Sequence, residues 1–347
     1  MALSPQETYR YSRQMRFGPI GPAGQERLRA SRIAVAGCGA LGSVIAEIMV
    51  RAGVGLVRLI DRDFVDASNL PRQSLFDEAD VAAVRPKAVA AAGKLRAINS
   101  AVTVEPLVAQ LTARNIERLT AGVDLLLDGT DNFPTRFLLN DAAVKHDRPW
   151  IFGAALAAHG MMMVIRPRLT PCLHCVLGDL PPPGSVPSCD QEGVLASTVH
   201  TVAALECVEA LKFLTGHAAA LEKRLVDFDL WAGRFDYRGI AALRGRGHCP
   251  ACEQQHYEYL DTALEPPQLL AGRDGVQVLP PADSPPLDLR AIADRLRPAG
   301  QVIANDYLLR FTAAGCTVTL FADGRAIVQG TLDLHQARAI YDRAVAR

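Results

Sequence analysis

The chain contains 347 residues, of which 49% are hydrophobic, and its 37 basic and 37 acidic side chains balance to a formal net charge of zero. This balance gives no electrostatic reason to expect nucleic acid or a membrane as a partner. The polar N-terminus lacks the apolar core of a signal peptide, and the most apolar stretch, residues 150–165, is too short to cross a membrane. We therefore expect a cytoplasmic protein with one large domain and a smaller part.

Residues 4–30 are predicted to be helical, with a break at the Gly-Pro-Ile-Gly-Pro stretch of residues 18–22. This segment carries Arg10, Arg13 and Arg16. The arginines form either a solvated helix face or an arm that brings a cation to a phosphate site.

Residues 32–63 contain an apolar run, a glycine cluster, a helical pattern and a second apolar run that ends in an acid. This order is typical of a nucleotide-binding strand, turn, helix and strand. Gly37 permits the tight turn, Gly39 lets a phosphate approach the backbone, and Gly42 lets helix and strand pack closely. The helix N-terminus offers N–H groups to an anion, and Asp61 can accept hydrogen bonds from ribose hydroxyls. A glycine turn that only serves packing is the alternative.

Polar residues continue beyond the second strand, at the edge where doubly wound sheets bind ligands. They are Asp63, Asn69, Arg72 and Gln73. A helix predicted over residues 86–98 then places Lys87 in its first turn. A lysine there opposes the helix dipole and gains nothing structurally, which favours a ligand-binding role for Lys87.

A further polar cluster, residues 128–132, follows the buried strand predicted over 125–127. Asp131 is a candidate ligand for Mg²⁺, because this ion takes one or two carboxylates together with phosphate oxygens. The alternative is structural, since Thr130 or Asp131 could cap the helix predicted over 133–145. The neighbouring predictions are strands over 102–106, 151–155 and 161–166 and a helix over 113–119.

Four of the eight cysteines form two CxxC pairs, Cys172 with Cys175 and Cys249 with Cys252. Two such pairs predict a tetrahedral zinc site, and four sulfur ligands make it closed and structural. Four reduced thiols in a core are the alternative. His174 lies between two of the ligands and is interpreted as a bystander.

The stretch from residue 178 to 193 is predicted to be a mobile loop, because it contains three consecutive prolines followed by a glycine. Its Cys189 lies outside both CxxC pairs and is either a nucleophile or an incidental loop residue. A long apolar helix is predicted over 196–215, with Cys207 in the core. Cys38, inside the glycine turn, has no assigned chemistry.

The composition of the sequence changes after the last cysteine pair. Residues 264–286 hold two Pro-Pro pairs and are predicted to be a linker. A small α+β unit follows, with helices near 287–296 and from 333 onward and strands near 307–312, 317–321 and 326–329. The predicted organisation is a nucleotide-binding domain that includes the cysteine site over 1–256, then the linker and small α+β domain over 257–347.

These motifs together resemble the ThiF/MoeB/HesA adenylyltransferases, the bacterial relatives of ubiquitin-activating enzymes. The resemblance covers about residues 5–255 and implies a doubly wound, mostly parallel Rossmann-like sheet that dimerises. It is carried by RYSRQ (Arg10–Gln14), GCGALG (Gly37–Gly42), DRD (Asp61–Asp63), SNLPRQ (Ser68–Gln73), RPK (Arg85–Lys87), GTDN (Gly129–Asn132), CLHC and CPAC.

The resemblance also implies roles for individual residues. Asp61 would bind the ribose of ATP, Asp131 would bind Mg²⁺, and Arg13 would reach the ATP site of a partner subunit. Cys189 matches the position that becomes linked to the carrier in the ThiF-like branch. Asn69, Arg72 and Lys87 would hold the phosphates. The other nucleotide-binding residues would be Asp63, Gln73, Asn132 and the three glycines. The zinc ligands would be Cys172, Cys175, Cys249 and Cys252.

The implied substrate is a small ubiquitin-like sulfur-carrier protein ending in Gly-Gly. Its terminal carboxylate, with a pKa of about 3.5, attacks the α-phosphate of ATP and needs no general base. Arg13, Arg72, Lys87 and Mg²⁺ would stabilise the charge at phosphorus. The activated carrier would then receive sulfur from a donor protein, directly or through Cys189, for thiamine, molybdopterin or other sulfur metabolism.

Other activities share parts of this pattern. A related enzyme could activate a small molecule or a modified tRNA with the same ATP site, but the paired CxxC motifs argue against the tRNA-modifying relatives. An NAD-dependent oxidoreductase shares the glycine motif without needing Arg72, Lys87 and Asp131. The C-terminal region does not resemble a rhodanese domain, because Cys316 has no basic, glycine-rich loop around it. We interpret that region as a docking or dimer-supporting module.

Overall fold

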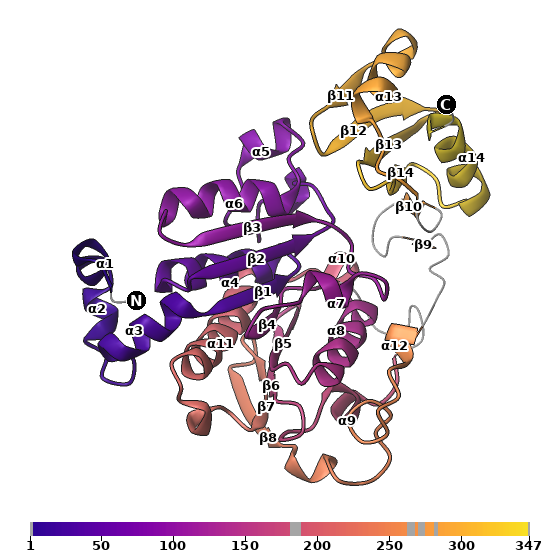
Figure 1. Ribbon diagram of the computed structural model, residues 1–347. Helices are drawn as coiled ribbons and strands as arrows, with labels where there is room; N and C mark the ends of the chain where they lie inside the picture. The colour runs from indigo at the N-terminus through magenta and orange to yellow at the C-terminus, as the bar shows by residue number, and fades with distance from the viewer. Residues whose placement is uncertain (1–2, 181–188, 262–267, 270–274, 281–283, 346–347) are drawn as a thin grey trace. The chain divides into compact units, whose positions relative to one another are not determined.

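The computed structural model describes residues 3–180, 189–261, 268–269, 275–280 and 284–345. The chain divides into two compact units, Met1–Asp261 and Thr262–Arg347 (Figure 1). Each unit has its own sheet and its own hydrophobic core. The domain boundary expected after residue 256 stays a prediction, and most of the predicted linker lies outside the described residues.

The first unit is built on an eight-stranded sheet. Its strands are β1 (Arg32–Ala36), β2 (Leu56–Asp61), β3 (Thr103–Val108), β4 (Leu125–Asp128), β5 (Trp150–Leu156), β6 (His159–Ile165), β7 (Arg224–Asp229) and β8 (Arg234–Gly239). The strand order is β3-β2-β1-β4-β5-β6-β7-β8. The pairs from β3 to β5 are parallel, and those from β5 to β8 are antiparallel. The order reverses at β1, so β1 and β4 frame the crevice where such sheets bind ligands.

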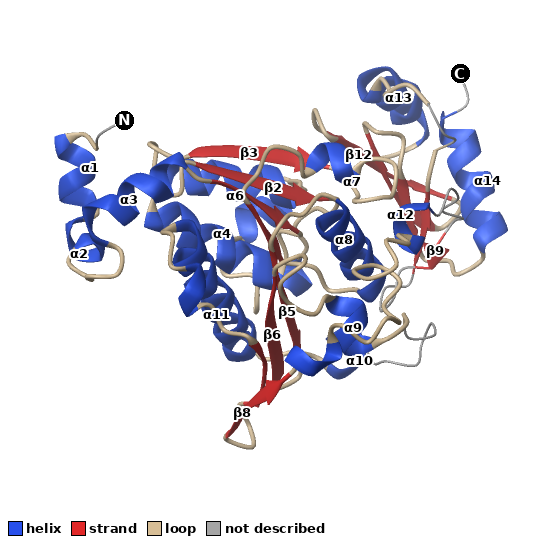
Figure 2. Cartoon of the chain, turned by 60° about the horizontal axis from the view of Figure 1, so that its bottom comes forward, coloured by secondary structure: helices blue, strands red, loops and turns tan. Residues whose placement is uncertain are grey.

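Helices cover both faces of this sheet, which confirms the predicted doubly wound α/β fold. They are α1 (Pro5–Arg10), α2 (Ser12–Met15), α3 (Gly21–Ala30), α4 (Ala40–Ala52), α5 (Glu78–Ala82), α6 (Lys87–Ile98), α7 (Ile116–Leu119), α8 (Phe133–Lys145), α9 (Leu173–Leu177), α10 (Cys189–Glu192), α11 (Ala196–Leu214) and α12 (Glu258–Asp261). Figure 2 shows α4 and α11 on one side of the sheet and α8 on the other. In β1, Ile33 and Val35 face the α4 core, whereas Ala34 and Ala36 face the α8 core. Burial on both faces explains why the strand is a continuous apolar run.

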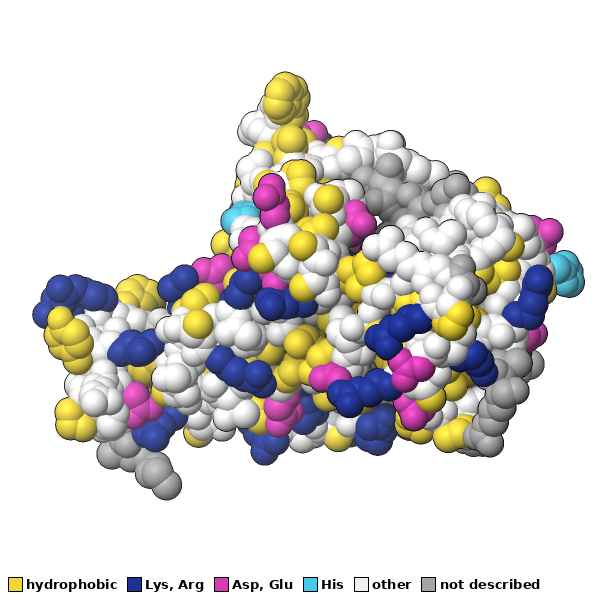
Figure 3. Space-filling model, turned by 90° about the horizontal axis from the view of Figure 1, so that it is seen from above, with side chains coloured by type: hydrophobic (Ala, Val, Ile, Leu, Met, Phe, Trp, Pro, Cys, Tyr) yellow, Lys and Arg dark blue, Asp and Glu magenta, His cyan; other side chains and the backbone are white. Residues whose placement is uncertain are grey.

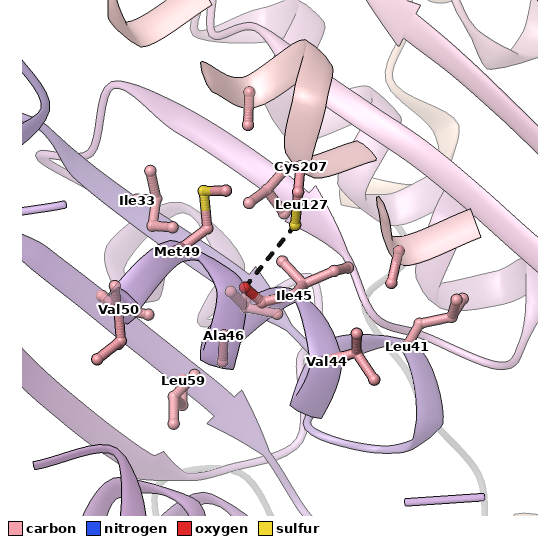
Figure 4. Close-up of a cluster of buried hydrophobic side chains, with 14 of the residues drawn as sticks. Ile33, Leu41, Val44, Ile45, Ala46, Met49, Val50, Leu59, Leu127 and Cys207 are labelled. Atoms are coloured by element: carbon pink, nitrogen blue, oxygen red, sulfur yellow. Dashed lines mark hydrogen bonds between the residues drawn. The ribbon is translucent and has the colours of Figure 1, made fainter. Parts of the chain in front are cut away.

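Helices α4 and α11 pack against each other in the core of Figure 4. Ile45 and Met49 of α4 are fully buried there, as their helical spacing predicts. The Cys207 thiol of α11 lies 3.9 Å from the carbonyl oxygen of Ile45. Burial raises the pKa of this thiol well above its usual range, so Cys207 behaves as a small apolar core residue.

One element of the sheet was not predicted, and one predicted helix begins later than expected. The β7–β8 hairpin was not expected, although Val226 and Phe228 alternate with polar residues, and Phe228 stacks on Phe235 with ring centroids 4.9 Å apart. The helix expected over 113–119 begins only at Ile116. Its N-cap residue, Asn115, accepts a hydrogen bond from the Thr112 N–H at 3.0 Å, which keeps the preceding residues in a loop.

The N-terminal helices are anchored at the C-terminal end of α4. Tyr11 is buried against Gly53, where a Cβ would lie 2.5 Å from the tyrosine ring. The Tyr11 hydroxyl accepts a hydrogen bond from Asn99 Nδ2 at 2.8 Å, and Gln14 Nε2 donates to the Ala52 carbonyl at 2.9 Å. Because β2 begins shortly after Gly53, this arm lies at the amino-terminal edge of the sheet.

The segment that follows Cys189 is attached to the tip of the β5–β6 hairpin. Cys189 is the first residue of α10, and residues 181–188 of the predicted mobile loop lie outside the described residues. The Ala157 N–H donates to the Gly193 carbonyl at 2.9 Å, and the Leu195 N–H donates to the Ala157 carbonyl at 3.0 Å. These two bonds join the start of α11 to the hairpin.

The second unit is a six-stranded antiparallel sheet with helices, as expected for a small α+β module. Its elements are β9 (Gln268–Leu269), β10 (Gly275–Val278), α13 (Leu289–Leu296), β11 (Val302–Ala304), β12 (Leu308–Ala313), β13 (Cys316–Phe321), β14 (Ala326–Gln329) and α14 (Leu334–Val345). The strand order is β11-β12-β13-β14-β10-β9. Ile292 of α13 and Ile340 of α14 pack with Val318 in one core, which also buries Cys316.

The surface matches the neutral composition. On the face shown in Figure 3, Lys and Arg side chains are interspersed with Asp and Glu rather than gathered into one basic area. Among the described residues, no helix has both the length and the apolar character needed to span a bilayer.

Candidate functional site

The glycine turn between β1 and α4 lies against the loop that follows β4. Gly37 has a φ of +86°, and a Cβ there would lie 2.5 Å from the carbonyl oxygen of Gly129. A Cβ on Gly42 would lie 1.9 Å from the carbonyl oxygen of Gly37. Only glycine fits at these positions, because the turn, the helix and the neighbouring loop approach each other through their backbones.

Gly39 differs from the other two glycines, because the space above it is open. A Cβ there would meet only Gln73 Nε2, at 3.8 Å. Gln73 is 3% exposed, and its Oε1 has no hydrogen-bond partner among the described residues. Gly39 also precedes α4, whose N-terminus has no side-chain cap. Open space, free N–H groups and an unpartnered amide oxygen together fit a nucleotide phosphate and its ribose.

Asp61 connects the end of β2 to the glycine turn. Its Oδ2 accepts a hydrogen bond from the Cys38 N–H, and its Oδ1 accepts one from the Asp63 N–H, both at 2.6 Å. Burial raises the pKa of Asp61, and the nearby Lys87 acts in the opposite direction. Each carboxylate oxygen keeps a second lone pair, so the side chain retains acceptor capacity towards ribose hydroxyls.

Lys87 is the first residue of α6 and is brought to the same edge. Its side chain is 5% exposed, and its Nζ lies 3.5 Å from Asp63 Oδ2. Its backbone N–H donates to the Asp63 carbonyl at 2.8 Å. Helix α6 begins one residue after Pro86, which occupies the N-cap rather than the first helical position. The structure therefore joins Asp61, Asp63 and Lys87 into one polar group.

The loop between β2 and α5 contributes the next candidates. Asn69 is 1% exposed and closes a short turn, because its Oδ1 accepts a hydrogen bond from the Asp66 N–H at 3.3 Å. The guanidinium of Arg72 is half-buried and donates to the Ser68 carbonyl at 2.8 Å. This bond uses one of five N–H donors, so the rest of the fork is available to a phosphate.

Asp131 is exposed in the loop after β4 and caps no helix. The N-cap of α8 is Asn132, whose side chain accepts a hydrogen bond from the Thr135 N–H at 3.0 Å. The structural alternative, in which Thr130 or Asp131 is the cap, is therefore wrong. Asn132 Nδ2 donates to Asp131 Oδ1 at 3.2 Å and orients the carboxylate. An oriented, exposed carboxylate in a loop that touches the glycine turn suits Mg²⁺.

A buried ion pair that the sequence analysis did not single out supports this loop. Asp128 Oδ1 accepts hydrogen bonds from both the N–H and the hydroxyl of Thr130. Its Oδ2 accepts one from Arg136 Nε at 3.1 Å. Arg136 Nη2 also donates to the carbonyls of Thr130 and Gly153, at 2.8 and 3.1 Å. The sequence signal that could have indicated this ion pair is the arginine at position 136, within a helix that is otherwise mostly buried.

Arg13 is not brought to these residues within one chain. It lies on α2, beside the C-terminal end of α4, whereas the glycine turn precedes the N-terminal end of the same helix. The thirteen residues of α4 span about 20 Å. Among the described residues, Arg13 makes no hydrogen bond or ion pair within its own chain.

The four paired cysteines meet in one cluster. Their sulfur atoms all lie within 4.8 Å of one another, and the separations include 3.8 Å for Cys172–Cys175, 3.5 Å for Cys172–Cys249 and 3.4 Å for Cys175–Cys252. A tetrahedron of sulfurs about 2.3 Å from a central zinc has edges of about 3.8 Å. The donor set and its spacing therefore fit zinc.

His174 points away from this cluster. Its Nε2 lies 3.4 Å from Asp141 Oδ1 of α8, and its ring packs edge-on against Phe137 at 4.7 Å between centroids. The neighbouring Leu173 N–H donates to Asn140 Oδ1 at 2.8 Å. His174 thus joins the segment of the first cysteine pair to α8, and its interpretation as a bystander of the metal site stays a prediction. The Cys189 side chain lies outside the described residues, so its predicted role stays a prediction.

The fold and the site define a nucleotide-binding α/β protein with a tetracysteine cluster. The model of the family described as "ThiF family" matches residues 11–251. The chain therefore belongs to the ThiF family, as its motifs indicate.

Curated relatives extend the match. The "Sulfur carrier protein ThiS adenylyltransferase" of Bacillus subtilis is 42% identical over 338 residues, covering 97% of this chain and 99% of the relative. The "Sulfur carrier protein adenylyltransferase" of Thermus thermophilus is 38% identical, covering 73% and 93%. The structure titled "Crystal structure of E. coli MccB + ATP" has a TM-score of 0.59 and 20% identity, over 70% of this chain and 74% of MccB. This last likeness shows the fold alone.

Proposed function

We propose that this protein is an adenylyltransferase that activates the C-terminal Gly-Gly carboxylate of a small ubiquitin-like sulfur-carrier protein with ATP. The observation that supports this most is the 42% identity with the Bacillus subtilis ThiS adenylyltransferase over nearly the whole of both chains. The joined polar edge of Asp61, Asp63 and Lys87 beside the open Gly39 is the matching site in this chain.

In this proposal the nucleotide lies across the carboxyl ends of β1, β2 and β4. The ribose binds Asp61, and the phosphates lie over Gly39 and the start of α4. Asn69, Arg72, Gln73 and Lys87 hold the phosphate oxygens. The carrier carboxylate attacks the α-phosphorus, pyrophosphate leaves, and a carrier acyl-adenylate remains for sulfur transfer in thiamine, molybdopterin or other sulfur metabolism.

Metal ions have two roles in the proposal. Asp131, oriented by Asn132, holds Mg²⁺, which supplies positive charge to the phosphate oxygens. The four-cysteine cluster holds zinc, which stabilises the fold and leaves no open position for a reactant. Cys189 lies on α10, in the crossover between the zinc cluster and α11. Its thiolate attacks the carrier acyl-adenylate, so that a thioester to the carrier forms and AMP leaves.

The ATP site is completed by a second copy of the chain. Arg13 lies about one helix length from its own nucleotide edge, so it serves the site of the partner in a homodimer. Tyr11 and Gln14 hold the arm rigidly enough to present this arginine. We place the enzyme in the cytoplasm, where a sulfur donor and the carrier meet.

The decisive experiment is ATP–pyrophosphate exchange with purified protein, Mg²⁺ and several carriers that end in Gly-Gly. Exchange that depends on one carrier is expected. Carriers lacking the terminal glycine are the matched control and should give none. ATP binding without exchange for any carrier would contradict the proposal and would indicate a small-molecule or tRNA substrate.

A further inference from the structure

Glu206 is a fully buried acid that the proposed reaction does not use. It lies in the middle of α11, its side chain has no exposure to solvent, and neither carboxylate oxygen has a hydrogen-bond partner among the described residues. A carboxylate ion in such a place would lose its hydration without compensation. This position therefore favours the uncharged acid.

The carboxyl group of Glu206 fills a notch over Gly153 of β5. A Cβ on Gly153 would lie 1.9 Å from Glu206 Oε1 and 2.9 Å from Val202 Cγ1. The carbonyl of the same glycine accepts a hydrogen bond from Arg136 Nη2 at 3.1 Å. Glu206 thus touches a residue that is tied directly to the ion pair beneath the Asp131 loop.

The charges around Glu206 point the same way. Burial has the largest effect and raises its pKa well above the usual range; the Asp128 carboxylate adds to this, and the Asp128 backbone and Arg136 act against it. The adjoining thiol of Cys207 is itself neutral, since burial raises its pKa. The cluster thus holds two carboxyl groups and one cation. The cluster is neutral overall only when one of the two carboxyl groups keeps its proton. Asp128 accepts hydrogen bonds from Arg136 and Thr130, so the proton is assigned to Glu206.

We propose that Glu206 is a positioning residue that acts as an uncharged carboxylic acid, filling the notch over Gly153 and leaving Arg136 paired with Asp128 alone. The loop 129–132 begins from that pair and presents Asp131. The role assigned to Asp131 rests on the proposed function, whereas the protonation state of Glu206 does not.

The first test is the pH dependence of unfolding of the full chain, comparing wild type with Glu206→Gln. A carboxyl whose pKa is raised by folding holds a proton that the unfolded chain releases above pH about 4.5, so stability falls as pH rises. As pH rises above about 4.5, the ratio of the two folding constants should shift towards the variant, by up to about tenfold per pH unit for as long as the folded carboxyl keeps its proton. Parallel curves would overturn the uncharged acid.

Glu209→Gln is the matched control on the same helix. Glu209 is also buried, but its Oε1 accepts a hydrogen bond from Lys212 Nζ at 2.6 Å and its Oε2 accepts one from the Glu222 N–H at 2.8 Å. Its substitution removes an ion pair, so this variant should be less stable than wild type at neutral pH. The two glutamine variants should therefore change the stability at neutral pH in opposite directions, which distinguishes an uncharged acid at Glu206 from a paired carboxylate at Glu209.

The second test separates positioning from simple packing by measuring the dissociation constant of Mg²⁺–ATP. Glu206→Ala, which empties the notch, should weaken binding about tenfold, while Glu206→Gln should restore it to within about twofold of wild type. Cys207→Ala, an equally buried change on α11, should lower stability and leave nucleotide affinity unchanged. Wild-type affinity in Glu206→Ala would overturn positioning. No binding by any variant or by wild type would overturn the proposed function, and the unfolding curves would still decide the protonation state.

Discussion

The cysteine cluster and the nucleotide edge are assembled in different ways. The paired cysteines are 77 residues apart in sequence, yet one chain brings all four sulfurs within 4.8 Å. The nucleotide edge draws on residues 37–132, and its proposed cation Arg13 remains at the opposite end of α4. A cluster that is complete within one chain can stabilise the fold alone, whereas the proposed nucleotide site has Lys87 and Arg72 in its own chain but would take Arg13 from a second subunit.

The largest effect is expected from Cys249→Ser, which removes one sulfur from the closed cluster. The protein should lose its zinc, and because its two cores remain, it should be destabilised by about 3–5 kcal/mol, or about 10 °C in Tm. Metal analysis measures the zinc content, and thermal unfolding measures the loss of stability. Cys316→Ala, a buried thiol of the second unit, is the control and should keep full zinc content. Normal zinc binding by Cys249→Ser would mean that the cluster is not a zinc site.

Lys87→Met should remove about 2–4 kcal/mol of transition-state stabilisation, which is about 30- to 1,000-fold in ATP–pyrophosphate exchange. The control lies on the same helix, because Lys94 pairs with Asp77 and Asp80 rather than with the nucleotide edge. Lys94→Met should lower stability and leave the exchange rate of the folded enzyme nearly unchanged. Equal losses of exchange in the two variants would show that Lys87 has no specific role in the nucleotide site.

Mixing inactive subunits tests whether Arg13 acts across the dimer. Arg13→Ala and Lys87→Met should each be nearly inactive alone. In a mixed dimer, one of the two sites has an intact Lys87 and receives Arg13 from the other chain. Co-refolded equal amounts should therefore regain about a quarter of wild-type exchange. Arg10→Ala replaces a residue that bonds the Ile98 carbonyl of its own chain and serves as control. No recovery on mixing would contradict action in trans.

The smallest effect on these two sites is expected from ending the chain after Asp261. Both sites lie wholly in the first unit, so zinc content and Mg²⁺–ATP affinity should stay within about twofold. If the second unit supports docking or dimerisation, carrier affinity or the dimerisation constant should fall several-fold, measured by calorimetry and sedimentation. Unchanged values for both would reject that interpretation of the module.

Local motifs made much of the fold predictable. The glycine turn, β1, α4 and β2 follow from short-range periodicity and turn chemistry within residues 32–63, and α8 follows from the apolar spacing of residues 133–145. The cysteine cluster follows from pair spacing alone. The glycine turn and each CxxC pair depend on neighbours in the sequence, and two matching pairs are enough to predict one metal site although they lie 77 residues apart.

Features that depend on long-range contact were not predictable. The ion pair of Asp128 with Arg136 and the notch of Gly153 filled by Glu206 join four different elements, and no spacing rule relates them. Asn132 was passed over as the cap of α8, because several adjacent residues can cap a helix and only the backbone decides. The position of Arg13 likewise depends on how Tyr11 packs against Gly53.

The two hydrogen bonds between Ala157 and the segment 193–195 limit how far Cys189 can lie from the β5–β6 hairpin. Only three residues separate Cys189 from Gly193, so even a fully extended chain keeps the Cα atom of Cys189 within about 14 Å of Gly193. Any carrier tail that Cys189 receives must therefore be delivered to the neighbourhood of the β5–β6 hairpin. In the proposed reaction, the tip of the hairpin therefore limits where the step at Cys189 can take place.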